Sequence, residues 1–100
     1  MSLSIEEMER YSRQIPVIGV EGQLKLKNTT MLIIGLGGLG SIASMYLVAS
    51  GVGRLIIVDN ESVELSNLQR QILYTISDLG KPKAYVARDR LSMINPNVEI

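Results

Sequence analysis

"MLIIGLGGLGSIASMYLV", residues 31–48, sets the fold class of this 100-residue chain. It begins with an apolar run, as expected of a short parallel strand that is buried on both faces. Four glycines follow in a G-x-G-x-x-G pattern with one extra member: Gly35, Gly37, Gly38 and Gly40. In that pattern the first glycine allows a tight turn, the second lets a phosphate approach the backbone, and the last lets helix pack on strand. The small and apolar residues that come next predict a helix to about residue 50.

A second strand and an acidic residue follow at the spacing of a strand–helix–strand unit. Residues 51–53 would end the helix, and residues 55–58 are again apolar, so the unit takes about 30 residues, the usual length of a βαβ crossover. Asp59 follows Gly40 by 19 residues, where a carboxylate can accept hydrogen bonds from ribose hydroxyls. The plainer interpretation is that Asp59 only starts the turn DNES. To this point NAD and ATP fit the pattern equally well.

The segments before the glycine turn predict two helices. Ser4 and Glu7 have the spacing of a capping box, which predicts a first helix over residues 5–15 that ends near Pro16. A weaker helical stretch covers residues 21–27, and a turn then leads into the first strand.

The segments after the second strand complete the predicted fold. A short helix is predicted over residues 66–73, a longer one opens at Pro82, and residues 98–100 begin a third strand. The fold class is α/β, a Rossmann-like parallel sheet with flanking helices. We divide the chain into an N-terminal helical extension, residues 1–30, and the first part of a Rossmann-like nucleotide-binding domain, residues 31–100. So few strands leave an apolar sheet edge open, so we expect an incomplete domain.

Composition excludes several classes of function. The chain is 46% hydrophobic and 20% charged with a net charge of zero, which is typical of a globular protein and argues against a nonspecific nucleic-acid surface. It has no cysteine and no histidine, so its chemistry must use carboxylates, cations and backbone amides. The acidic N-terminus is unlike a signal peptide, and the apolar runs are far shorter than the roughly 20 residues that span a bilayer. We expect a cytoplasmic protein with no membrane contact.

Two segments separate the possible nucleotides, SNLQRQ at residues 66–71 and GKPKA at residues 80–84. ATP carries a triphosphate, which needs several cations and amide donors, whereas NAD needs little beyond the glycine turn and the acid. Suitable groups stand at Asn67, Arg70, Gln71 and Lys83. A cation in the first turn of a helix opposes the helix dipole, so a role for Lys83 outside helix stability is plausible. The alternative, that Arg70 and Lys83 are ordinary surface charges, is not decided by the spacing.

A family resemblance adds to this interpretation. The motifs RYSRQ, GLGGLGS, GVGRLIIVDNESVELSNLQRQ, GKPKA and INPNVEI, in this order and at this spacing, resemble the ThiF/MoeB/HesA adenylyltransferases, relatives of the ubiquitin-activating enzymes. The resemblance runs from Glu9 onward. It implies an enzyme that uses ATP and Mg²⁺ to adenylate the C-terminal carboxylate of a ubiquitin-fold carrier protein ending in Gly-Gly. Such enzymes release pyrophosphate and serve thiamine, molybdopterin or similar sulfur-transfer biosynthesis.

The resemblance also implies roles for single residues. Gly38 would lie against the phosphates and Asp59 would hold the ribose. Arg13, in RYSRQ, matches an arginine that in bacterial relatives reaches the partner subunit's ATP across a homodimer. Together with Arg13, the cations at positions 70 and 83 are the implied catalytic residues. Phosphate binding is implied for the glycines of the turn and for Asn67, Arg70, Gln71 and Lys83.

Some features of the family do not occur in this sequence. In relatives, the aspartate that helps to hold Mg²⁺, the CxxC pairs that bind Zn²⁺ and a later cysteine lie beyond the position equivalent to residue 100. Glu61 stands where relatives usually carry the second acid of Asp-x-Asp. We therefore predict that these 100 residues alone are inactive.

Three alternatives stay open. The first is adenylation of another acceptor, a modified tRNA base or a peptide. The second is a NAD-binding dehydrogenase. The third is a binding subunit that keeps the fold without catalysis, which the presence of Arg13, Asp59 and Lys83 argues against.

Overall fold

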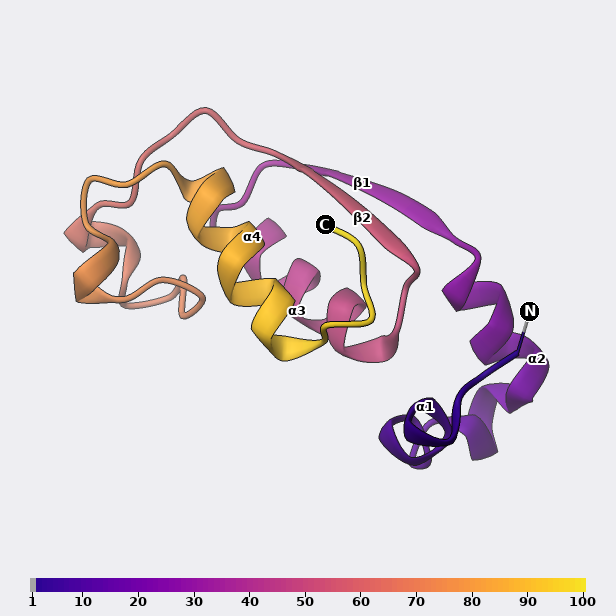
Figure 1. Ribbon diagram of the computed structural model, residues 1–100. Coiled ribbons are helices and arrows are strands. Elements are labelled where there is room, and N and C mark those ends of the chain that lie inside the picture. The colour runs from indigo at the N-terminus through magenta and orange to yellow at the C-terminus, as the bar shows by residue number, and fades with distance from the viewer. Residues whose placement is uncertain (1) are drawn as a thin grey trace.

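The computed structural model describes residues 2–100, in which one parallel two-stranded sheet is covered on one face by helices (Figure 1). Strand β1 is Thr30–Ile34 and strand β2 is Arg54–Val58, paired in register from Thr30 opposite Arg54. Helix α3, Gly40–Ser50, connects them. This is the predicted strand–helix–strand unit, and the α/β class with flanking helices is confirmed.

The predicted third strand is present only as its beginning. Arg54 N donates to the carbonyl of Thr29 at 3.1 Å, on the β1 side, and the next amide, Leu55 N, donates to the carbonyl of Glu99 at 2.8 Å. Successive amides of a strand point to opposite edges, so Glu99 lies on the edge of β2 away from β1, in a parallel bridge. The order of the three segments in space is therefore 3-2-1, as in one half of a Rossmann fold.

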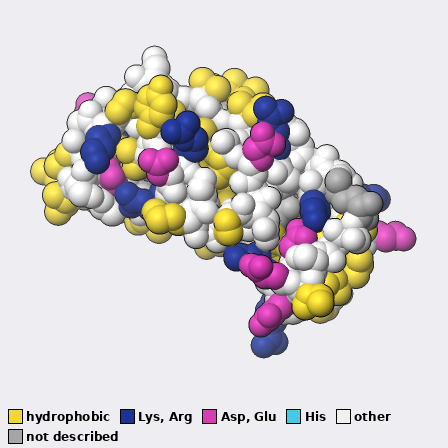
Figure 2. Space-filling view, viewed as in Figure 1, with side chains coloured by type: hydrophobic (Ala, Val, Ile, Leu, Met, Phe, Trp, Pro, Cys, Tyr) yellow, Lys and Arg dark blue, Asp and Glu magenta, His cyan; other side chains and the backbone are white. Residues whose placement is uncertain are grey.

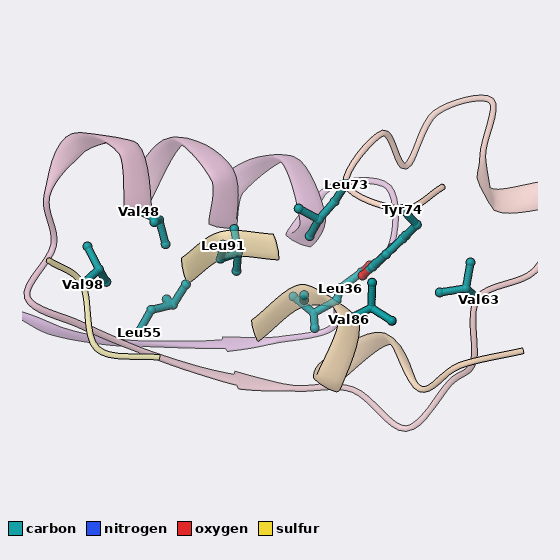
Figure 3. Close-up of a cluster of buried hydrophobic side chains, with 10 residues drawn as sticks. Leu36, Val48, Leu55, Val63, Leu73, Tyr74, Val86, Leu91 and Val98 are labelled. Carbon is teal, nitrogen blue, oxygen red and sulfur yellow. The ribbon is translucent and has the colours of Figure 1, made fainter. Parts of the chain in front are cut away.

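The core lies between the sheet and helices α3 and α4, the latter Lys83–Ile94 (Figure 3). Its buried members are Leu36, Val48, Leu55, Val63, Leu73, Tyr74, Val86, Ala87, Leu91 and Val98. The prediction that the strands are buried on both faces is wrong for the described residues. Both helices cover the same face, so the side chains that point the other way are exposed: Leu32, Ile34, Ile56 and Val58.

The N-terminal extension contains helices α1, Ile5–Arg10, and α2, Ile15–Lys27. The capping box at the start of α1 is confirmed, because the Ser4 hydroxyl accepts from Glu7 N at 3.0 Å and the Glu7 carboxylate accepts from Ser4 N at 2.9 Å. The prediction that Pro16 ends the first helix is wrong. Proline lacks the N–H that a first helical turn leaves unpaired anyway, and Pro16 lies in the first turn of α2. Gly19, with φ +75°, then kinks α2.

A buried polar cluster, the N-terminal anchor, joins this extension to the sheet domain. Beyond the end of α4, Asn95 Nδ2 donates to the Tyr11 hydroxyl at 2.8 Å and to the carbonyl of Val48 at 2.9 Å. Two glutamine side chains of the extension donate to one carbonyl, that of Ser50, at 2.7 and 2.9 Å. The N-terminal anchor consists of Tyr11, Gln14, Gln23 and Asn95. On the face shown in Figure 2, the extension projects from the body of the molecule.

Short turns replace the helix predicted over residues 66–73. The 3-10 turns are η1, Leu65–Asn67, and η2, Ile76–Asp78. At the start of η1 the Asn67 side chain accepts from Glu64 N at 2.8 Å, as one half of a capping box. Pro82 precedes α4 in an extended conformation instead of opening it from inside. Within residues 2–100, no helix is long and apolar enough to cross a membrane.

Candidate functional site

The glycine turn connects the end of β1 to the start of α3, and two of its glycines are required by the fold itself. Gly35 has φ +98°, a conformation that favours glycine. A Cβ added to Gly40 would lie 1.8 Å from the carbonyl oxygen of Gly35. Any side chain at position 40 would therefore push α3 away from the strand, which is the packing role predicted for the last glycine.

The other two glycines face the segment that carries SNLQRQ. A Cβ added to Gly38 would lie 3.5 Å from Arg70 Nε, and one added to Gly37 would lie 3.8 Å from Gln71 Nε2. Both distances are ordinary van der Waals contacts, so the fold does not require glycine at either position. The structure therefore brings Arg70 and Gln71, which follow the turn by more than 30 residues, directly against it.

Asp59 is half-buried at the end of β2 and is fully engaged with the backbone. Its Oδ2 accepts from Leu36 N in the glycine turn at 2.7 Å, and its Oδ1 accepts from Glu61 N at 2.7 Å. Asp59 therefore does form the turn. A carboxylate has about four lone-pair sites, so it can also accept hydrogen bonds from hydroxyl groups. Beside it, a pocket of about 390 Å³ opens at the carboxyl ends of both strands, the usual ligand site of such sheets. It is lined by Ile34, Gly35, Val58, Asp59, Asn60 and Glu61.

Lys83, the first residue of α4, is only 3% exposed. Its Nζ lies 6.0 Å from the centroid of the Tyr74 ring, within cation–π range. It forms no salt bridge with any of residues 2–100. The alternative that Lys83 is an ordinary surface charge is therefore wrong. The Lys83 side chain is largely buried and its ammonium group has no carboxylate partner among these residues, so the position suits an anionic ligand.

Gln71 is buried, with 2% of its surface exposed. Its Oε1 is the only buried side-chain oxygen or nitrogen in the described part of the chain without a hydrogen-bond partner. Buried polar atoms in folded proteins are almost always paired. The amide nitrogen of Gln71 can donate to a phosphate, whereas its unpaired oxygen would require a donor.

The remaining predicted residues, Asn67, Arg13 and Arg70, differ in burial and position. Asn67 is half-buried beside this group, with its side-chain oxygen used by Glu64 N. Arg13 is exposed in the turn between α1 and α2, and this turn lies at the opposite end of the molecule from the loop that precedes α4 (Figure 1). Arg70 is exposed as well, with Nη1 donating to the carbonyl of Ser66 at 3.1 Å. The structure thus brings together every predicted site residue except Arg13.

Tyr74 is a component of the site that the sequence did not predict. It is 3% exposed, and its hydroxyl donates to the carbonyl oxygen of Leu36 in the glycine turn at 2.7 Å (Figure 3). Burial raises the pKa of Tyr74, and the negative charge of Asp59 raises it further, so the hydroxyl keeps the proton that it donates. The one sequence feature that could have indicated Tyr74 is its position three residues after Gln71.

The fold and these contacts define a class: an α/β protein whose glycine turn meets a strand-ending acid, an arginine and a buried lysine. The ThiF family matches residues 11–100, and the chain belongs to this family.

Individual relatives agree with this assignment. The chain is 52% identical to a probable molybdopterin-synthase adenylyltransferase of Porphyra purpurea, over 97% of this chain and 26% of the relative. It is 50% identical to the sulfur carrier protein ThiS adenylyltransferase of Escherichia coli, over 91% of this chain and 37% of the relative. It superposes on the E. coli tRNA N6-threonylcarbamoyladenosine dehydratase, solved with ATP, with a TM-score of 0.92 and 26% identity, over 99% of this chain and 41% of that one. The chain thus spans between about a quarter and two fifths of these relatives.

The acidic side chains near this site determine whether it can hold a metal ion. Among residues 2–100, no three acidic side chains gather as a metal site would require. Both oxygens of Asp59 already hold backbone amides. We therefore assign no ligand for Mg²⁺ or Zn²⁺ to these residues.

Proposed function

We propose that the protein to which these residues belong adenylates the C-terminal carboxylate of a ubiquitin-like sulfur-carrier protein with ATP. The observation that carries the proposal is Lys83, a largely buried cation without an ion pair in the described chain. It lies beside Tyr74, whose hydroxyl is bonded to the glycine turn that Arg70 covers. Three kinds of group favour one polyanionic ligand: backbone amides of a turn, a helix N-terminus and two cations. The names of two relatives, both adenylyltransferases, support the same reaction.

In the proposed reaction, a carboxylate oxygen of the carrier forms a bond to the α-phosphorus of ATP. The bond from that phosphorus to the oxygen bridging to the β-phosphate breaks, and pyrophosphate leaves with the bonding electrons. No side chain needs to take a proton, since the attacking carboxylate is already ionised, so the lack of histidine is no obstacle. Catalysis then consists of positioning and charge neutralisation, and we assign neutralisation of the leaving pyrophosphate to Arg70 and Lys83.

The remaining groups are assigned to holding the nucleotide. Gly37 and Gly38 let the phosphates approach the turn, because neither needs a side chain for the fold. Asp59 would accept from the ribose hydroxyls at the mouth of the 390 Å³ pocket, with apolar walls from Ile34 and Val58. Donors to the outer phosphates are supplied by Asn67 and Gln71. Mg²⁺, which would neutralise phosphate charge further, would need ligands other than those described.

Arg13 is assigned to a partner subunit's site. The turn that holds it lies at the opposite end of the molecule from the loop that precedes α4 (Figure 1), which favours a role at the site of a second copy. The helices beside it expose apolar side chains, with Ile5 90% and Val17 84% exposed, as a subunit interface would require. We therefore propose a homodimer in which Arg13 completes the partner's site, and a cytoplasmic location for the reaction.

A second candidate is adenylation of a different acceptor. It is supported by the ATP-bound solved relative, which is named for an activity on a modified tRNA base. Binding of NAD is disfavoured, because a pyrophosphate linkage does not require the extra buried cation at Lys83.

Exchange of labelled pyrophosphate into ATP tests the proposal. The full-length protein is expected to catalyse exchange only when a carrier ending in Gly-Gly is present. The matched control is the same carrier without its last two residues, which should support none. ATP binding without exchange on any sulfur carrier would favour the different acceptor, and preferential binding of NAD would overturn the nucleotide assignment.

A further inference from the structure

We propose that Tyr74 is a positioning residue that holds the glycine turn and the phosphate-binding segment together before ATP arrives. The inference rests on the proposed ATP site. The hydroxyl of Tyr74 hydrogen-bonds to the turn, and its ring lies beside Lys83. Tyr74 is assigned no contact with the reacting carboxylate or the phosphorus.

The first argument is that the Leu36 peptide is held from both sides. Leu36 N donates to Asp59 Oδ2 at 2.7 Å, and the Leu36 carbonyl accepts from the Tyr74 hydroxyl at 2.7 Å. Its side chain is fully buried. Glycines stand on both sides of Leu36, and glycine backbones have more accessible conformations than any other. A turn of this composition therefore keeps one shape only if groups outside it fix the peptide between the glycines.

The second argument is that Tyr74 belongs to the segment that carries the phosphate-binding side chains. Tyr74 N donates to the carbonyl of Gln71 at 3.2 Å, and Gln71 N donates to the carbonyl of Asn67 at 2.8 Å. This segment has no regular helix to set its position. The long-range bond to Leu36, spanning 38 residues, therefore fixes where Arg70 lies over Gly38.

The third argument is the ring of Tyr74 beside Lys83. The 6.0 Å separation places the ammonium near a π-face, which attracts a cation electrostatically. Because Lys83 makes no ion pair within residues 2–100, the ring is the neighbour that stabilises its charge in the absence of ligand. One side chain thus positions the turn, the segment with Arg70, and the buried cation.

The decisive variant is Tyr74→Phe in the full-length protein, because it removes the hydroxyl and keeps the ring. The turn would then populate its ATP-binding shape less often, and apparent affinity falls in proportion to that population. Loss of about one hydrogen bond corresponds to an approximately fivefold rise in the Kd for ATP. Hydrogen exchange of the Leu36 amide in the unliganded protein should accelerate by a similar factor, while amides of α4 keep their rates. The matched control is Tyr85→Phe, at an exposed tyrosine on α4, which should change neither quantity.

Two outcomes would overturn the proposal. Unchanged ATP affinity and unchanged exchange at Leu36 would show that the hydroxyl positions nothing. Equal acceleration of exchange at Leu36 and throughout α4, with an unchanged Kd for the folded fraction, would show general packing instead. If the unmodified protein bound no ATP, the proposed function would fail, yet the exchange measurement would still decide whether Tyr74 fixes the turn.

Discussion

Two buried polar clusters, the N-terminal anchor and the site around the glycine turn, differ in how well their polar groups are paired. In the anchor, Asn95, Gln23 and Tyr11 all take part in hydrogen bonds between 2.5 and 2.9 Å long. In the site, Gln71 Oε1 has no partner, and Lys83 has no counter-ion among the described residues. A buried polar group left unpaired costs about 1–3 kcal/mol. We infer that the anchor stabilises the fold, whereas the unpaired groups of the site bind groups that a ligand supplies.

Lys83→Met gives the largest expected effect and tests whether the site, unlike the anchor, binds a ligand. Removing a single preorganised charge-stabilising group typically lowers kcat by about 10²–10³-fold, and we expect a loss of this size in pyrophosphate exchange. Thermal stability should stay the same or rise, because an unpaired buried cation is replaced by an apolar chain of similar length. Parallel kinetic and melting measurements check this. A matching loss of stability would mean that Lys83 is structural.

Asn95→Ala should produce the reverse pattern. It leaves the Tyr11 hydroxyl and the Val48 carbonyl without their shared donor, which we expect to destabilise the protein by about 2–3 kcal/mol. The Kd for ATP at the glycine turn should not change, since the anchor lies at the other end of α3. Denaturation and ATP titration of the same preparation test both halves. Weaker ATP binding by the folded protein would contradict the separation of the clusters.

The glycine turn offers a matched pair of smaller substitutions. Gly40→Ala places a Cβ 1.8 Å from the carbonyl oxygen of Gly35, so α3 must shift, at a cost of about 1–3 kcal/mol in stability. Gly38→Ala makes only a 3.5 Å contact with Arg70. It should leave the melting temperature unchanged but weaken ATP binding, because the methyl group occupies the approach of the phosphates. If both variants lost stability equally, Gly38 would also be structural.

Gln71→Leu should change stability only slightly, and in the stabilising direction. Replacing an unpaired buried acceptor by an apolar side chain of similar size should raise stability by up to about 1 kcal/mol. ATP binding should weaken at the same time, because the amide donor is lost. Denaturant titration with and without ATP measures both effects. A fall in stability without ATP would mean that Gln71 Oε1 is paired in solution.

The sequence predicted what depends on neighbours in the chain. The glycine turn, both strands, α3 and the capping box are local signals of periodicity and spacing, and they were confirmed. The prediction for Pro16 is wrong because proline occurs both after helices and in their first turn. The exposed sheet face escaped prediction because an apolar strand does not tell whether one face or both are covered.

For the candidate site, the sequence indicates which residues to consider but not how they are arranged. Asn67, Arg70, Gln71 and Lys83 were selected by charge and family resemblance, and the structure brings them to the turn through a stretch without periodicity. Burial of Lys83 and the reach of Tyr74 to Leu36 depend on packing across 38 or more residues. No local pattern encodes such contacts. The role of Arg13 stays a prediction, because it requires a second subunit.

The bond from Asn95 to Tyr11 spans 84 residues and therefore orders events during synthesis. Helices α1 and α2 are translated before their docking partner Asn95, which follows Tyr11 by 84 residues. At about 5–20 residues per second, that interval lasts roughly 4–17 s. During this time Ile5 and Val17 are available to chaperones or to other nascent chains. The helices of the extension are thus translated well before the side chain that locks them in place.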